Sequence, residues 1–310
     1  MAASNWPVLS LSESQETLDA FHLWTQIVGK VRLELEPMVN HWWQIVLYVS
    51  ARGLTTSLMP AGGVGLEMEF DLIEHRLDVR TTEGKTRSVP LAPGSIADFY
   101  AATMDALEGV GTPVRIYPQA QEMDDDVPFP QDTAPRPYDP DVLHQLWLAL
   151  VQMTRVMYAF RARFQGKVSP VHFFWGGPDL AVTRFSGRTA PRHPGGVPHC
   201  ADWIQQMAYS HEVSSCGYWP GGSEEGTFYS YAYPTPFGFG DRRVEPAAAS
   251  WNADLGEFLL PYTAVREADD PDATLLSFFQ STYEAAADLA DWDRAALEVS
   301  TPPSLGDPPV

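Results

Sequence analysis

An acidic, proline-rich segment at residues 119–140 places the strongest constraint on how this chain of 310 residues folds. The segment contains five aspartates and five prolines. Proline fixes φ and removes a backbone donor, and neighbouring carboxylates repel one another, so a regular helix or strand is disfavoured there. We expect a linker or an exposed strap. The chain then divides into a first unit (1–118), the linker (119–140), a second unit (141–296) and a flexible tail (297–310).

Composition excludes several classes of protein. A chain that is 45% hydrophobic buries enough apolar surface to fold, and two cysteines cannot cross-link a fold of this length. The net charge of -20 disfavours nucleic-acid binding. No apolar run has the length of a membrane span, and residues 1–11 lack the blocks of a signal peptide. We therefore expect a soluble, cytoplasmic protein with neither a nucleic-acid nor a membrane partner.

Hydrophobic periodicity predicts helices and antiparallel strands in both units. Each unit opens with an amphipathic helix, at 13–32 and at 142–164, and ends with another, at 98–107 and 277–289. Strict alternation from Leu66 to Leu72 is typical of a strand with one buried face. The fold class predicted is α+β, with two helix–antiparallel sheet–helix units. Further strands are expected at 77–80, 86–91, 227–233 and 257–262.

The order of short motifs suggests that the two units are copies. Gly-Lys-Val occurs at 29–31 and again at 166–168, and each is followed by an expected aromatic strand with one histidine, at 41–43 and 172–175. A strand with an arginine comes next, carrying Arg52 in the first unit and Arg184 in the second. We predict an internal duplication that packs as one pseudo-symmetric body, although the spacing of the motifs differs between the units.

Cationic residues at matching positions point to an anionic ligand. Lys30 and Lys167 are two of only three lysines in the chain, and Arg52 and Arg184 lie in apolar strands. A guanidinium fork suits a carboxylate, sulfate or phosphate group, so these four residues are candidates for binding a small anionic metabolite. The alternative is structural: each lysine caps a helix C-terminus, and each arginine forms a salt bridge.

Three histidines within aromatic segments, His41, His172 and His211, are candidate bases. Burial would keep such an imidazole neutral, although a buried histidine bonded to the backbone is an equally good interpretation. Glu212 follows His211, but the two side chains point to opposite faces of a strand unless a bulge intervenes. We assign catalytic roles to His172, His211, Glu212 and Glu257. Substrate contacts are assigned to Lys30, His41, Arg52, Lys167, Trp175, Arg184 and Tyr209.

Searches for standard catalytic motifs exclude several reactions. The chain has no phosphate-binding glycine loop, no second zincin ligand after His211-Glu212 and no Gly-x-Ser-x-Gly turn. Nucleotide hydrolysis, zinc proteolysis and ordinary esterase chemistry are therefore disfavoured. We expect no cofactor and no metal. A mononuclear metal site built from His172, His211 and Glu257 remains an alternative.

Seven segments carry a resemblance to known proteins: residues 21–32, 40–43, 51–56, 169–176, 184–188, 209–212 and 256–262. They resemble one family of uncharacterised bacterial proteins, catalogued as domain of unknown function 5996. The resemblance spans nearly the whole chain and implies a stand-alone bacterial protein, but it carries no assigned reaction. The resemblance suggests that relatives act in secondary metabolism, including the formation of aziridines with loss of an anionic leaving group.

These observations lead to three hypotheses. The first is a non-redox enzyme of the lyase or transferase type, which carries out an elimination or cyclisation on an anionic metabolite with a Lys/Arg clamp and a histidine acid/base. The second is a metabolite-binding or assembly protein without catalysis, with a possible protein partner. The third is the metal-dependent enzyme.

Overall fold

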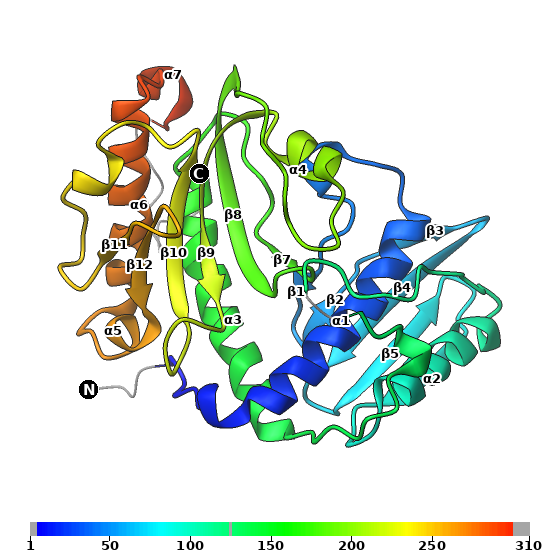
Figure 1. The fold of residues 1–310 in the computed structure, drawn as a ribbon. Helices are drawn as coiled ribbons and strands as arrows, with labels where there is room; N and C mark the ends of the chain where they lie inside the picture. The colour runs from blue at the N-terminus through cyan, green and yellow to red at the C-terminus, as the bar shows by residue number, and fades with distance from the viewer. Residues whose placement is uncertain (1–4, 124–125, 300–310) are drawn as a thin grey trace, which may run out of the picture.

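The computed structural model describes residues 5–123 and 126–299 of the chain. In these residues seven α-helices accompany two antiparallel sheets of six strands each (Figure 1). The α+β class expected from the sequence is confirmed. Most of the expected tail lies outside the described residues, which end at Val299.

The N-terminal sheet has the order β1-β2-β4-β5-β6, and β3 pairs with β4. Alternation in β4 buries Leu66, Met68 and Phe70, and helices α1 and α2 cover the sheet, with Phe21 of α1 packed edge-on against Phe70. The elements are α1 Gln15–Leu35, β1 Tyr48–Val49, β2 Gly53–Thr55, β3 Met59–Ala61, β4 Val64–Asp71, β5 Arg76–Thr81, β6 Thr86–Pro90 and α2 Ile96–Gly109.

The C-terminal sheet has the order β11-β12-β10-β9-β8-β7. Helices α3 and α6 pack on one of its faces, where Phe160 of α3 meets Phe279 of α6. The elements are α3 Pro140–Ala162, β7 His172–Phe174, β8 Asp179–Thr189, α4 Asp202–Ala208, β9 His211–Trp219, β10 Thr227–Tyr233, β11 Ser250–Asn252, β12 Glu257–Pro261, α5 Tyr262–Arg266, α6 Pro271–Leu289 and α7 Arg294–Leu297. Residues 5–123 and 126–299 also contain four short 3-10 helices: η1 Ser12–Ser14, η2 Asn40–Trp42, η3 Phe129–Gln131 and η4 Phe239–Asp241.

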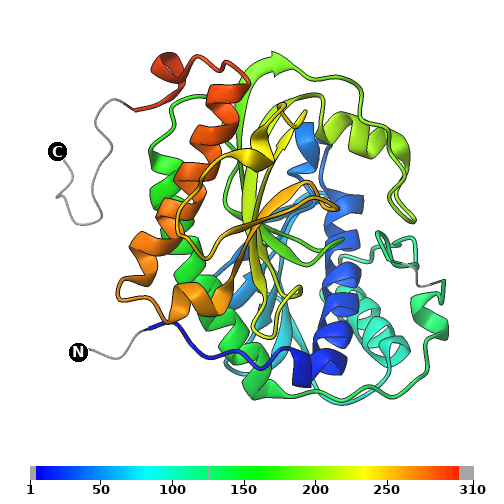
Figure 2. The same ribbon diagram turned by 60° about the vertical axis from the view of Figure 1, so that its left-hand side comes forward.

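The two sheets meet edge to edge. Leu47, just before β1, exchanges two backbone hydrogen bonds of 2.8 Å with Phe173 of β7. The strands lie between two helical layers, with α1 and α2 on one side and α3 and α6 on the other (Figure 2). One continuous apolar core draws on both units. The division into two duplicated units stays a prediction.

Several local expectations were wrong. The aromatic segment at 41–43 is not a strand, because His41 and Trp42 have φ of 60° and 63°, in the left-handed region that a strand cannot contain. The first Gly-Lys-Val lies inside α1, which continues to Leu35, so Lys30 does not cap the end of that helix as the structural alternative expected, whereas the second Gly-Lys-Val follows the end of α3. Helix α4 lies in a stretch for which no regular element was predicted.

Candidate functional site

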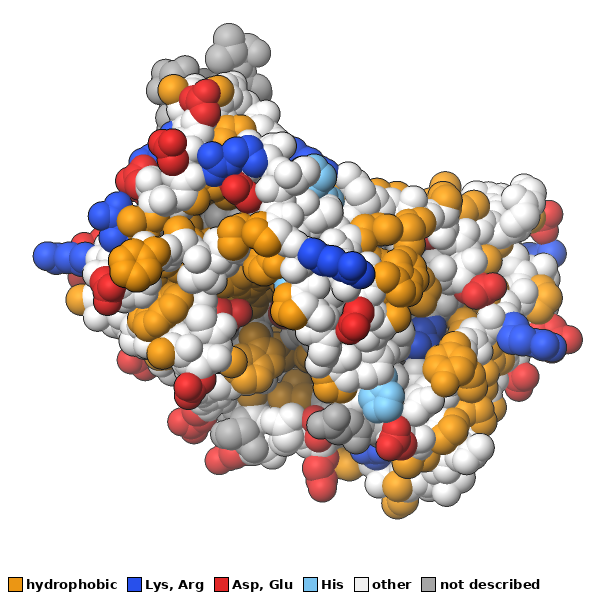
Figure 3. All heavy atoms as spheres, turned by 45° about the horizontal axis from the view of Figure 1, so that its top comes forward, with side chains coloured by type: hydrophobic (Ala, Val, Ile, Leu, Met, Phe, Trp, Pro, Cys, Tyr) orange, Lys and Arg blue, Asp and Glu red, His pale blue; other side chains and the backbone are white. Residues whose placement is uncertain are grey.

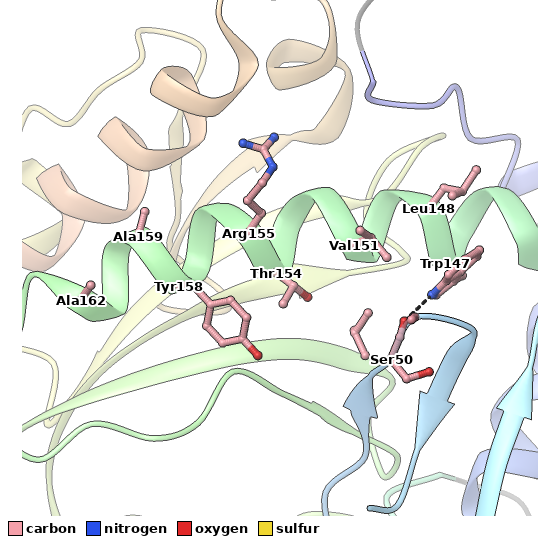
Figure 4. A pocket seen from close by; sticks show the side chains of 11 residues that line it. Ser50, Trp147, Leu148, Val151, Thr154, Arg155, Tyr158, Ala159 and Ala162 are labelled. Atoms are coloured by element: carbon pink, nitrogen blue, oxygen red, sulfur yellow. Dashed lines mark hydrogen bonds between the residues drawn. The ribbon is translucent and has the colours of Figure 1, made fainter. Parts of the chain in front are cut away.

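An apolar groove along α3 is one of the largest hollows in the described residues, with a volume of about 700 Å³. Figure 4 shows Thr154 and Tyr158 on the side of α3 that faces the strands, while Arg155 points to the opposite side. Arg155 is paired with Asp272, and Trp147 donates to the carbonyl of Ser50 at 3.1 Å. Apart from the Tyr158 phenol, the described residues that line the groove therefore offer apolar surface and no unpaired ionisable side chain.

A second hollow, here called the sheet-face cavity, lies on the C-terminal sheet on the face opposite α3 and α6. Its volume is about 620 Å³, which suits a small organic molecule. Alternate residues of β7, β8, β9, β10 and β12 form its floor, while η2, α4 and residues 121–122 form its walls and rim. The space-filling view shows a recess with apolar side chains gathered around it (Figure 3).

Period-two alternation decides which side chains reach this cavity. In β8 the residues Asp179, Ala181, Thr183 and Phe185 line it. Arg184, between two of them, points instead to the helical side, where its guanidinium carbon lies 3.5 Å from the ring centre of Phe160. The strand thus has an aromatic, helix-covered face and a polar face that opens on the cavity.

His172 of β7 is the only histidine on the cavity floor among the described residues. It is 1% exposed, and its Nδ1 lies 2.8 Å from the carbonyl oxygen of Pro170. A carbonyl can only accept, so Nδ1 carries the proton and Nε2 keeps a lone pair. Nε2 is buried and has no hydrogen-bond partner in the described residues. Burial lowers the pKa of His172 to about 4, so the ring is neutral at pH 7.

Two carboxyl groups on the same floor, those of Asp179 and Glu257, have raised pKa values. Burial raises the pKa of Glu257 to about 7, and no ion pair with a described residue compensates it. The pKa of Asp179 is also raised to about 7, first by burial and then by the charges of Glu122 and Glu257, while a hydrogen bond from the Tyr229 hydroxyl opposes the shift. Both groups are therefore poised near neutral pH.

Glu122 brings a third carboxyl to the cavity. A Cβ added to Gly176 would lie 2.6 Å from Cδ of Glu122, so only glycine at position 176 leaves room for this carboxyl group. The residue as a whole is exposed, yet loss of water around its carboxyl group raises its pKa. The backbone N–H of Glu122 donates to Pro198 at 3.0 Å, which ties residue 122 to the loop before α4.

Hydroxyl groups connect the floor from strand to strand. The hydroxyls of Tyr209 and Tyr231 lie 2.8 Å apart, as do those of Thr183 and Ser215. Tyr231 also bonds to Ser215, so the four form a continuous chain. Burial raises the pKa of Tyr209 to about 12, so it stays protonated and can donate.

The rim is built from η2 and α4. Lys167 donates to Nε2 of His41 at 2.9 Å, and Nδ1 of His41 donates to the carbonyl of Ala208, at the end of α4, at 2.7 Å. Trp42 packs against Trp203 of α4 with ring centres 5.1 Å apart. Both nitrogens of His41 are therefore occupied, and this residue positions the rim instead of acting as a free base.

Lys30 is buried but does not line the cavity. Its ammonium lies 5.7 Å from the ring centre of Trp175, and Trp175 stands between it and the cavity. Trp175 donates to the carbonyl of Ile45 at 2.6 Å and packs against Gly29, where an added Cβ would fall 2.2 Å from its Nε1. Burial lowers the pKa of Lys30 to about 8.

The remaining predicted residues lie away from the floor. Arg52 was expected in a strand but lies in the turn between β1 and β2, where it pairs with Asp71 at 2.6 Å. Glu212 pairs with Arg188 at 2.7 Å on the helical side of β9. Strand parity separates Glu212 from His211, as expected. His211 reaches only the rim, where its ring centre lies 5.9 Å from that of His41.

The structure thus brings together five of the eleven predicted residues as cavity lining: His41, His172, Trp175, Tyr209 and Glu257. The cavity lining also includes four residues that were not predicted as site residues: Glu122, Asp179, Tyr229 and Tyr231. The alternation Tyr229, Tyr231, Tyr233 was a usable signal, because it places three phenols on one face of a strand. Glu122 had no comparable signal, since it lies in the segment interpreted as a linker.

Within the described part of the chain, no group of three or more His, Cys, Asp or Glu side chains is arranged to hold a metal ion. The alternative site of His172, His211 and Glu257 therefore does not assemble in this arrangement. Among residues 5–123 and 126–299, no helix combines the length and apolar character needed to cross a membrane.

Comparison with known proteins gives one match. A family model described as a family of unknown function, DUF5996, matches residues 6–299. Searches of curated proteins and of solved structures returned no match.

Proposed function

We propose that this chain, which belongs to the family of unknown function DUF5996, is a small-molecule enzyme that transfers protons in the sheet-face cavity. The observation that carries the proposal is the unpartnered Nε2 of His172, which shares a cavity with the carboxyl groups of Asp179 and Glu257. A neutral imidazole and a carboxyl group that is partly protonated near pH 7 are a base and an acid in one space.

The geometry gives each group a role. His172 would accept a proton at Nε2, because the Pro170 carbonyl holds the proton of its ring on Nδ1. Glu257, with a pKa of about 7, would donate a proton or take it back at the other side of the substrate. Non-redox reactions that move protons, such as elimination, cyclisation or isomerisation, fit this arrangement.

The anion clamp expected from the sequence is not part of the proposal. Arg184 stacks on the helical face of the sheet, Arg52 is paired in the other sheet, and Trp175 screens Lys30 from the cavity. What supports an enzyme is the cavity's own set of proton donors and acceptors.

Solvent deuterium offers a test that needs no known substrate. The protein in D2O would be incubated with a defined mixture of amino acids, polyamines, amino sugars and sugar phosphates, and analysed by mass spectrometry. We expect one compound to gain deuterium or to change mass, and His172→Asn and Glu257→Gln to abolish the change. Glu83→Gln, in an exposed turn, is the matched control.

Two results would count against the enzyme. Full turnover by folded His172→Asn, with folding checked by circular dichroism, would remove the proposed base. Binding of a compound without any turnover would favour the non-catalytic metabolite-binding protein.

A further inference from the structure

The charges around the sheet-face cavity have one sign. Glu122, Asp179 and Glu257 line it, whereas no lysine or arginine belongs to its lining among the described residues. Of the lysines behind the lining, Lys30 lies beyond the Trp175 ring, and Lys167 is bonded to His41. The carboxyl groups therefore enter the cavity without a compensating cation.

Unpaired carboxylates in such a space favour a positively charged occupant. Neither Glu122 nor Glu257 has an ion pair or side-chain hydrogen bond with a described residue, and the Asp179 carboxyl has only the Tyr229 hydroxyl. Burial of a carboxylate without a partner is costly, and a bound cation removes that cost. An anion would meet repulsion from all three.

A separate observation also indicates a ligand. His172 is 1% exposed and its Nε2 lacks a partner, and the Nε1 of Trp42, which is 6% exposed, also lacks one in the described residues. Both side chains line the cavity. A buried acceptor without a partner is unfavourable unless a ligand or water fills it, and an N–H group of a ligand would suit Nε2.

The walls favour an organic cation over a single ion. Rings of Trp43, Phe174, Trp175, Tyr229 and Tyr231 line the space, and the face of an aromatic ring attracts a cation. Tyr229 and Tyr231 stack with ring centres 6.0 Å apart and present a flat surface. A volume of about 620 Å³ exceeds the need of one ion and suits a molecule of metabolite size.

We infer that the sheet-face cavity binds a small organic cation, a molecule with an ammonium or amidinium group that sits among Glu122, Asp179 and Glu257 against the aromatic walls. This inference rests on the proposed function, because it names the substrate class of the same site. The cationic group would bind the carboxylates, and the part that reacts would face Nε2 of His172.

Calorimetry with three matched probes tests the inference. The probes are agmatine, which carries a guanidinium and an ammonium group, butane-1,4-diol, which is neutral, and glutarate, which is a dianion. At pH 8 and low salt we expect agmatine to bind and the other two not to bind. Asp179→Asn and Glu257→Gln should each weaken the affinity for agmatine about tenfold, which is the size expected when a hydrogen bond to a charged group is lost. Glu83→Gln should leave its affinity unchanged.

Three outcomes would overturn the inference: binding of glutarate but not of agmatine, binding of neither cation nor anion, or agmatine binding that the folded double variant Asp179→Asn/Glu257→Gln retains in full. The deuterium experiment separates this inference from the proposed function. Turnover of a neutral or anionic compound would contradict the cation inference and support the enzyme. Agmatine binding with no turnover of any compound would support the cation inference and contradict the enzyme.

Discussion

Replacing Glu257 by glutamine should stabilise the folded protein at pH 8. Burial raises the pKa of this carboxyl from 4.5 to about 7, so the ionised form is less favourable in the folded than in the unfolded state. A shift of that size corresponds to about 3 kcal/mol at most. Because the side chain is partly exposed to the open cavity, water screens it and we expect about 1 kcal/mol.

The sign follows from proton binding. Between pH 4.5 and about 7 the folded state holds more protons on Glu257 than the unfolded state, so stability falls as the pH rises through this window. Below it the carboxyl is neutral in both states, and above it the loss is complete. Glutamine stays neutral throughout, so the advantage of Glu257→Gln should be absent at pH 4, grow up to pH 7 and then level off.

Urea unfolding followed by tryptophan fluorescence at pH 4, 6 and 8 measures this difference, with Glu83→Gln as the control. A gain of about 1 kcal/mol corresponds to about 2 °C in Tm for a chain of this size. If Glu257→Gln were instead less stable than the native protein at pH 8, its carboxylate would have a partner that compensates it, and our description of the cavity would be wrong.

Three further changes test other parts of the structure. Gly29→Ala should cost about 1–3 kcal/mol, since its Cβ would fall 2.2 Å from Nε1 of Trp175, and urea unfolding measures the loss. Arg184→Met should leave the free energy of unfolding within about 1 kcal/mol of the native value, because two buried guanidinium nitrogens of Arg184 have no partner in the described residues. It should also leave agmatine binding unchanged, because Arg184 faces the helices, and a loss of binding would contradict that placement. Tyr229→Phe should raise the pKa of Asp179 further, since the phenol donates to that carboxylate, and carbon-13 NMR titration would reveal the shift.

Periodicity predicted the regular elements well because it reflects burial. The strand expected at 227–233 is β10 with the same bounds, and the helix expected at 142–164 differs from α3 by two residues at each end. The strand predicted at 41–43 was wrong because aromatic residues are typical of strands, whereas the left-handed conformation of His41 and Trp42 depends on tertiary contacts with α4.

The site was predicted only in part, for a physical reason. Counting along β8 places Asp179 and Arg184 on opposite faces, so parity alone could have separated the cavity residue from the helix-facing one. Pairing the two Gly-Lys-Val motifs suggested equivalent lysines, yet Lys30 is buried against Trp175 while Lys167 is exposed at the rim. Local sequence does not reveal that Glu122 reaches across to Gly176, because that contact depends on how the acidic segment crosses the fold.

The central claim is that carboxyl groups without an ion-pair partner in the sheet-face cavity bind a cation, and one measurement tests it most directly. Carbon-13 NMR titration of the side-chain carboxyls, assigned with Asp179→Asn and Glu257→Gln, should show these two titrating near pH 7 in the free protein. Saturating agmatine should move both pKa values down, because a bound cation favours the ionised form. If both carboxyls titrate below pH 5 without agmatine, or if agmatine leaves them unmoved, the account is contradicted.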